Sequence, residues 1–203
     1  MRWIGTCACV SWLGLTACAS APVEEHHYSL LLDALSDGSV ADSSSAPETT
    51  DATLAVKAVE LPVYLRSNNL VMQVGDNKIL PARRHFWAEP LADSLKRVLE
   101  YDLQRRLPGI AVRKLPESGC SLEVEFERFH ATDDARVAVS GYYSLEFGGE
   151  RIERTFDTSR TLPVGGYANS ISELRKSVGD LAAALASEIE GEISCQPASD
   201  IDS

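Results

Sequence analysis

Three glutamates alternate with apolar residues in the stretch SLEVEFERF, residues 121–129. Glu123, Glu125 and Glu127 carry the carboxyl groups that general acid–base chemistry uses. A spacing of two also places all three on the solvent-facing side of a strand whose other face is buried. The apolar residues between them favour the second interpretation. We therefore expect a solvated acidic strand face, with a carboxylate hydrolase as the weaker alternative.

Histidines offer a second route to chemistry, as metal ligands or as bases. His26 and His27 are adjacent, so their side chains point to opposite sides of a strand, and no third ligand follows nearby. His85 and His130 are isolated from the spacings typical of zinc sites. GxSxG, Walker A and GxGxxG patterns are absent from the sequence. We expect no catalytic residues, no metal and no cofactor, and hence a protein that is not an enzyme.

A cysteine with a different chemistry ends the segment LTAC, residues 15–18. Arg2 is the only charged residue before Glu24, and the apolar window between them is too short to span a bilayer but suits a secretory signal. LTAC resembles the bacterial lipobox, in which the cysteine is acylated and becomes the first residue. The alternative is an ordinary signal peptide that contains a cysteine. We predict a removed lipoprotein signal peptide at residues 1–17 and lipidation of Cys18.

The predicted lipid has consequences for location. Two or three acyl chains anchor a protein stably to a membrane, whereas a single short chain binds only marginally. The net charge of -11 disfavours attraction to anionic lipid surfaces and nucleic acid, so we expect the lipid to hold the protein and expect no nucleic-acid partner. Ala19 follows the cysteine, which by the sorting pattern of bacterial lipoproteins indicates the outer membrane, facing the periplasm. Residues 18–27 form the lipidated tether.

Two cysteines remain in the mature chain. Cys120 and Cys195 are one possible disulfide in an oxidising compartment. A bridge would close a loop of about 75 residues and stabilise the fold by roughly 4 kcal/mol through the lost entropy of the unfolded chain. Two unrelated thiols are the alternative.

The hydrophobic pattern predicts a single α+β domain over residues 28–195, with a mobile loop at 36–52 and a disordered tail at 196–203. Apolar residues recur at helical spacing after Pro90 and after Ser170, where Ser170 and Glu173 match a capping box. Two such helices can cover the dry face of one sheet, giving a two-layer sandwich with a largely antiparallel, mixed sheet. We expect strands at 28–32, 54–59, 70–74, 78–80, 110–113, 121–129, 137–147 and 151–161, and helices at 91–107 and 170–189.

Aromatic residues flank the hairpin that the turn Gly75-Asp76-Asn77 predicts. Aromatic side chains at the ends of elements often serve recognition. The alternative is that Phe86 and Trp87 fix the first helix to the sheet. The expected partner interface consists of Leu61, Pro62, Tyr64, Leu65, His85, Phe86, Trp87 and Glu89.

Four stretches carry a family resemblance: YSLLL, LPVYLRSNNLVMQVGDN, HFWAEPLADSLKRVLEYDL and LEVEFERF. In this order they resemble the PqiC/YmbA family of ABC-type transport auxiliary lipoproteins, over most of the mature domain. The resemblance implies a non-enzymatic outer-membrane component of a lipid transport system. The implied partners are an MCE-domain protein and an ABC transporter complex, with a second copy of the chain as a further possibility. The alternative function is a periplasmic lipid- or glycan-binding lipoprotein independent of a transporter.

Overall fold

The computed structural model describes residues 24–32, 52–112, 119–192 and 195. Cys18, the predicted signal peptide, the first part of the tether, residues 36–51 of the expected loop and the tail at 196–203 lie outside the described residues.

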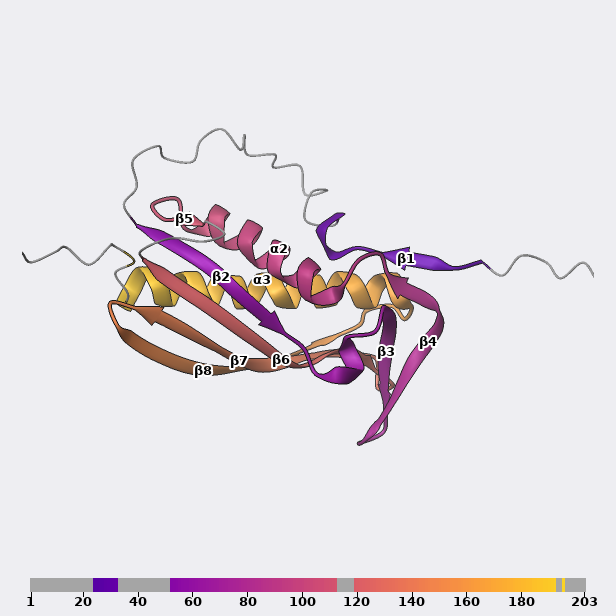
Figure 1. Ribbon diagram of the computed structural model, residues 1–203. Coiled ribbons are helices and arrows are strands. Elements are labelled where there is room, and N and C mark those ends of the chain that lie inside the picture. Colours follow the sequence, from indigo (N-terminus) through magenta and orange to yellow (C-terminus); the bar gives the residue numbers. More distant parts are fainter. Residues whose placement is uncertain (1–23, 33–51, 113–118, 193–194, 196–203) are drawn as a thin grey trace, which may run out of the picture.

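One mixed sheet of eight strands forms the first layer of the domain (Figure 1). β6 lies at its centre: β7 pairs antiparallel along one edge of β6, while β2 and β3 pair parallel with it on the other side. The strand order is β1-β4-β3-β6-β2-β5, and β7 branches from the other edge of β6 and pairs with β8. The strands are β1 His26–Tyr28, β2 Thr53–Glu60, β3 Asn69–Val74, β4 Lys78–Trp87, β5 Ala111–Val112, β6 Cys120–Thr132, β7 Arg136–Phe147 and β8 Glu150–Thr161.

The meander of β6, β7 and β8 confirms the antiparallel pattern predicted from the alternating residues. Phe126 is buried and faces the helices, whereas Glu125 and Glu127 face outward. The register shifts between Phe126 and Arg128, so the alternation changes phase there. Gly141 lies opposite Phe126, where a Cβ atom would overlap the carbonyl oxygen of Glu125. The bulge therefore requires glycine at this position.

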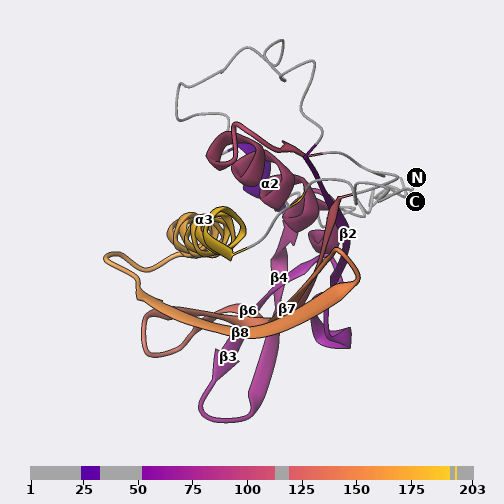
Figure 2. The ribbon, with the colours of Figure 1, turned by 90° about the vertical axis from the view of Figure 1, so that its left-hand side faces the viewer.

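Two long helices, α2 (Leu91–Arg106) and α3 (Tyr167–Glu192), form the second layer, and the sheet curves around α3 (Figure 2). This arrangement confirms the predicted two-layer α+β class. α3 begins at Tyr167, earlier than predicted, and the Ser170 hydroxyl donates to the carbonyl oxygen of Gly166. The predicted capping box is therefore wrong, because Glu173 lies within the helix and binds Arg160 and not a free backbone N–H.

The hairpin of β3 and β4 projects from the body of the domain (Figures 1 and 2). Its turn contains Gly75 at a φ of 62°, and the Gly75 amide donates to the carboxylate of Asp133 at 3.0 Å. β4 continues past Pro81 to Trp87, beyond the predicted end at residue 80. Pro81 is tolerated because this part of β4 pairs only with β3 among the described strands, so its other side needs no N–H donor.

β1 attaches the N-terminal segment to the same end of the domain. His26, His27 and Tyr28 pair parallel with residues 85–87 of β4. The strand predicted at 28–32 is wrong, because β1 ends at Tyr28 and residues 30–32 are helical. A short apolar run fits a strand or a helix equally well, because both can bury one side in a core. Leu30, fully buried, supplies that contact.

A disulfide joins Cys120, at the start of β6, to Cys195, beyond α3. The two Cα atoms lie 4.9 Å apart and both residues are buried. The carbonyl oxygen of Cys195 also accepts a hydrogen bond from the Thr53 amide at 3.0 Å. Cys195 is therefore held against β2 and β6 at the end of the sheet opposite the hairpin (Figure 1).

Candidate functional site

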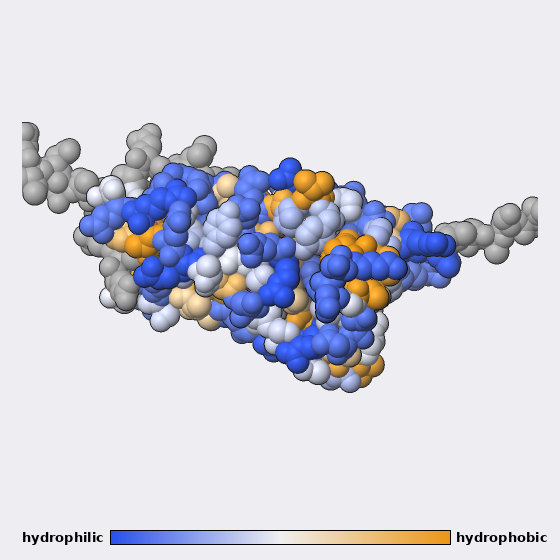
Figure 3. Space-filling model, turned by 90° about the horizontal axis from the view of Figure 1, so that it is seen from below, coloured by the Kyte–Doolittle hydropathy of each residue, from blue (hydrophilic) through white to orange (hydrophobic). Residues whose placement is uncertain are grey.

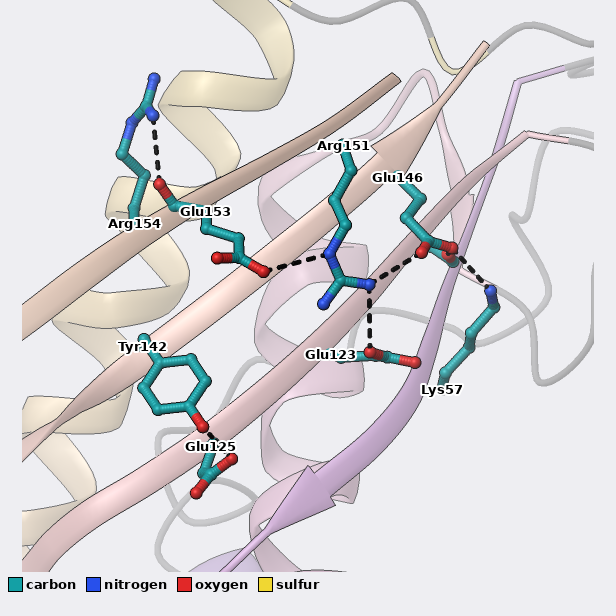
Figure 4. Close-up of polar contacts among 9 residues, drawn as sticks. Lys57, Glu123, Glu125, Tyr142, Glu146, Arg151, Glu153 and Arg154 are labelled. Carbon is teal, nitrogen blue, oxygen red and sulfur yellow. Dashed lines mark hydrogen bonds and ion pairs between the residues drawn. The ribbon is translucent and has the colours of Figure 1, made fainter. Parts of the chain in front are cut away.

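Three glutamates of the outer sheet face, Glu123, Glu146 and Glu153, belong to a network of ion pairs around Arg151 (Figure 4). Arg151 Nη1 lies 2.9 Å from Glu146 and 3.7 Å from Glu123, and its Nε lies 3.2 Å from Glu153. Lys57 Nζ donates to the other oxygen of Glu146 at 3.0 Å. Hydrogen bonds from Lys57 and Arg151 lower the pKa of Glu146, which stays ionised at neutral pH. Such ion pairs are typical of a solvated strand face. A general acid needs a raised pKa, which is the opposite of the shift at Glu146.

Tyr142 lies on the same face and donates its hydroxyl to Glu125 (Figure 4). This hydrogen bond raises the pKa of Tyr142, so the phenol stays protonated. The pKa shifts of Glu146 and Tyr142 thus hold each group in its ordinary charge state. The outer face has no acid–base pair of the kind that catalysis uses.

His26 of β1 and His85 of β4 form an aromatic stack with Tyr167 of α3. The centre of the His85 ring lies 4.9 Å from that of the His26 ring. It also lies 3.7 Å from the centre of the Tyr167 ring, which stacks on it. Tyr28 Oη lies 2.9 Å from His85 Nδ1. Desolvation lowers the pKa of His85, with smaller contributions from His26 and Arg84. Within the ranges that the structure describes, no three His, Cys, Asp or Glu side chains gather as metal ligands.

Three of the residues expected at a partner interface lie in the core. Leu61, Leu65 and Trp87 are 5%, 2% and 5% exposed, and the Trp87 ring packs 6.2 Å from that of Phe129. A surface role for these three is wrong, because each already fills space between the sheet and the helices. The others of the set are partly exposed: Pro62, Tyr64, His85, Phe86 and Glu89.

Two of these partly exposed residues also have partners within the domain. Tyr64 donates its hydroxyl to the carbonyl oxygen of Glu127 at 2.7 Å, and Glu89 forms an ion pair with Arg97. The stretch around residues 61–65 therefore contributes mainly to packing. Its exposed apolar side chain is that of Val63, which is 80% exposed in the 3-10 helix η1 (Val63–Leu65).

Exposed apolar side chains gather instead at the hairpin end of the domain. Leu80 on β4, Val164 in the segment before α3, and Tyr167 at the start of α3 are 38%, 64% and 36% exposed. Seen from below, the surface is largely hydrophilic, with hydrophobic residues in small separate groups (Figure 3). Sequence reasoning missed Val164 and Tyr167, because single apolar residues outside a periodic pattern carry no signal of exposure.

A hollow of about 430 Å³ opens at this end, between β3, the end of β6 and the start of α3. Its walls are mainly apolar and include Leu70, Met72, Phe129, Ala131 and Leu174. A smaller hollow of about 340 Å³ shares Met72 and Tyr167 with it and is lined by residues of β4. The hairpin thus separates two adjoining concave surfaces of different chemistry.

The structure thus defines a two-layer α+β domain with an ion-paired outer sheet face and an apolar hollow at one end. Among the helices that the structure describes, none is long and apolar enough to cross a membrane. The family model of the ABC-type transport auxiliary lipoprotein component matches residues 34–186. The chain belongs to this family, which confirms the resemblance noted in the sequence.

The chain is similar to the intermembrane transport lipoprotein PqiC of Escherichia coli strain K12 and to PqiC of Shigella flexneri. Each is 29% identical over 191 residues, covering 93% of this chain and 97% of PqiC. A crystal structure of an uncharacterized protein superposes with a TM-score of 0.71 at 27% identity, covering 82% of this chain and 99% of that one. A Xanthomonas campestris protein shares the fold at 13% identity and a TM-score of 0.58, covering 84% and 93%.

Proposed function

We propose that this chain is an outer-membrane lipoprotein, acylated at Cys18, that serves as a non-enzymatic accessory component of an MCE/ABC-type intermembrane lipid transport system. In this role it docks a periplasm-spanning MCE partner. Family membership and the similarity to PqiC, whose name describes an intermembrane transport lipoprotein, support the proposal over nearly the whole length of the chain.

The observation that carries the docking role is the projecting hairpin with the exposed apolar residues at its base. Leu80, Val164 and Tyr167 lie at this end, and the hairpin adds three cations, Lys78, Arg83 and Arg84, to a chain whose net charge is -11. Exposed apolar side chains rimmed by polar residues mark interaction surfaces. Leu80 lies on the hairpin, which stands out from the body (Figure 2), and Tyr167, at the start of α3, lines the same groove as Leu80.

The predicted tether is a second argument for docking at the hairpin end of the molecule. β1 binds β4 beside the base of the hairpin, and eight residue steps separate Cys18 from His26. A fully extended chain of that length reaches at most about 30 Å. An acylated Cys18 therefore keeps the hairpin end within roughly that distance of the membrane surface. A partner that spans the periplasm therefore meets the docking surface at the outer membrane.

Leu80→Asp tests the docking surface. Binding of the purified lipoprotein to the purified MCE-domain protein of the same cell is measured by biolayer interferometry. We expect Kd to rise at least about tenfold, because a buried carboxylate replaces an apolar contact at the interface. Tyr142→Ala is the matched control, since Tyr142 is 40% exposed but lies on the outer sheet face. Wild-type affinity in a folded Leu80→Asp protein removes this surface from the proposal.

Cys18→Ser tests the anchor. The wild-type protein is expected to incorporate labelled palmitate and to sediment with outer membranes. The variant is expected to lose the label and to remain in the periplasmic fluid, because in this proposal the acyl chains hold the acidic domain on the membrane. An unlabelled wild-type protein contradicts the proposal.

A further inference from the structure

We propose that the apolar hollow and the adjoining arginine groove form one binding site for an anionic amphiphile. Its acyl chain fills the hollow between β3, β6 and α3, and its anionic head group binds Arg83 and Arg84 on β4. This inference goes beyond the proposed function, which requires only contact with a protein partner.

The hollow has the size and the lining of a small-molecule site. Its volume of about 430 Å³ lies within the range of roughly 300–1,000 Å³ that is typical of ligand pockets. Leu70, Met72, Phe129 and Leu174 contribute apolar surface from three different elements. Burial of an acyl chain against such walls is favoured by the hydrophobic effect, at about 0.8 kcal/mol per methylene in the general case.

The polar groups of the hollow are already bonded within the protein. His130 Nδ1 lies 3.2 Å from the carbonyl oxygen of Ala131, Thr132 Oγ1 donates to that of Arg136 at 3.0 Å, and Ser170 Oγ donates to a backbone oxygen at 3.1 Å. Burial also lowers the pKa of His130, which is therefore neutral at pH 7. The walls thus supply apolar contact and few free hydrogen-bonding groups.

The small number of free hydrogen-bonding groups in the hollow determines which class of ligand it favours. A peptide that entered the hollow would bring backbone N–H and C=O groups that lose water without gaining partners, which costs free energy for each group. An acyl chain brings no such groups. The hollow therefore favours the tail of an amphiphile over a segment of polypeptide.

The groove beside the hollow supplies the opposite chemistry. It is lined by Leu80, Arg83, Arg84 and His85 of β4, and Tyr167 lies in the wall that it shares with the hollow. Arg83 and Arg84 are exposed, and no ion pair links either of them to an acid in the described part of the chain. Both residues line the groove, and a guanidinium group that faces it makes a charge-assisted hydrogen bond to a carboxylate or phosphate.

The charges also fix which way the amphiphile points. Asp133 also lines the hollow, and its carboxylate accepts the amide of Gly75 in the hairpin turn. An anionic head group is repelled there and attracted at Arg83 and Arg84, so the tail enters past Tyr167 and the head stays in the groove.

The test measures binding of cis-parinaric acid to the purified full-length protein by its fluorescence, with its methyl ester as the probe that has the same tail but no charge. We expect the acid to bind about tenfold more tightly than the ester. Arg83→Glu combined with Arg84→Glu removes this preference, whereas Lys78→Glu, the same charge change at the hairpin turn, keeps it. Equal binding of acid and ester by the wild type overturns the assignment of the head group.

Gly165→Phe tests the hollow itself. Gly165 lines the hollow, and a Cβ there meets no atom within 4 Å, so a phenylalanine at this position adds a ring at the hollow without displacing the backbone. We expect both probes to bind at least about tenfold more weakly, because the ring occupies the space of the tail. Gly109→Phe is the matched control, since its Cβ is equally free but lies outside the hollow. Wild-type binding by a folded Gly165→Phe protein overturns the proposal.

Vesicles distinguish the two sources of such a ligand. Phosphatidylglycerol vesicles that carry a pyrene-labelled phosphatidylglycerol are mixed with the protein, and transfer of the label to the protein is followed. Transfer assigns the anion to a phospholipid, and binding of parinaric acid without transfer assigns it to a fatty acid. Binding of neither probe overturns the proposal. Because neither assay contains the MCE partner, these results are independent of the docking experiment.

Discussion

The buried ion pair between Asp102 of α2 and Arg175 of α3 yields a prediction about what holds the two helices together. Arg175 donates Nη1 to Asp102 Oδ2 at 2.8 Å and Nη2 to Oδ1 at 2.7 Å. The two side chains are 13% and 10% exposed, so water screens the pair little. Arg175→Met removes one charge and leaves the carboxylate of Asp102 buried without its partner.

The expected cost follows from this burial. Breaking a buried pair on one side typically costs about 3–5 kcal/mol, because the remaining charge is desolvated and unpaired. Arg175 Nε has no hydrogen-bond partner among the described atoms, so the arginine is incompletely satisfied and its loss lies at the lower end, about 3 kcal/mol. Asp102→Leu combined with Arg175→Met leaves no buried charge, and the double variant is expected within about 1 kcal/mol of the wild type.

Urea unfolding of the oxidised protein measures these differences. At an m-value of about 2 kcal/mol/M, Arg175→Met lowers the midpoint by roughly 1.5 M, and the double variant recovers most of that loss. Arg128→Met is the control, because the pair of Arg128 with Asp157 is 41% and 68% exposed and is expected to contribute little. The reasoning is refuted if the double variant is as unstable as Arg175→Met, since the cost would then come from lost packing and not from an unpaired charge.

Three further predictions concern the sheet. Replacing Cys120 and Cys195 by alanine opens a loop of 75 residues and is expected to lower the free energy of unfolding by about 4 kcal/mol in urea titrations; an equally stable variant contradicts this. Gly141→Ala places a methyl group against the Glu125 carbonyl oxygen and is expected to cost about 1–3 kcal/mol in thermal melts, whereas an unchanged melting temperature would show that the bulge relaxes. Because burial lowers the pKa of His130 in the folded state, the unfolded chain binds the proton first as the pH falls. Stability is therefore lost below about pH 6.5, and His130→Gln is expected to lose less between pH 7.5 and 5.5; parallel curves would exclude His130 as the cause.

Local periodicity predicted the parts of the fold whose environment repeats along the chain. The alternation around Phe126 located β6 because one face of that strand is dry, and the apolar stripes located α2 and α3 for the same reason. The parallel pairing of β2 with β6 has no such signal. Leu54 meets Cys120 across 66 positions of sequence, and no local pattern specifies that contact.

The candidate site was harder to predict, because its character depends on which residues the fold buries. Trp87 has the side chain of a recognition residue and lies in a suitable segment, but it is buried and its ring packs against Phe129 of β6. Leu80 and Tyr167 are distant in sequence and come together only because the hairpin meets the start of α3. Ordinary single apolar residues thus form the exposed surface, while the aromatic residue that the sequence favoured stabilises the core.

The disulfide described above links the stability of the domain to its place in the cell. The 75 residues between its cysteines include β7, β8 and α3, so the bond encloses the part of the fold that completes both layers. Thiols stay reduced in the cytosol, where a newly made chain lacks this constraint and the roughly 4 kcal/mol that it contributes. That amount is a large share of the total stability of a typical domain. If the chain is exported as we propose, it is easiest to unfold before secretion and becomes resistant to unfolding once it has been oxidised outside.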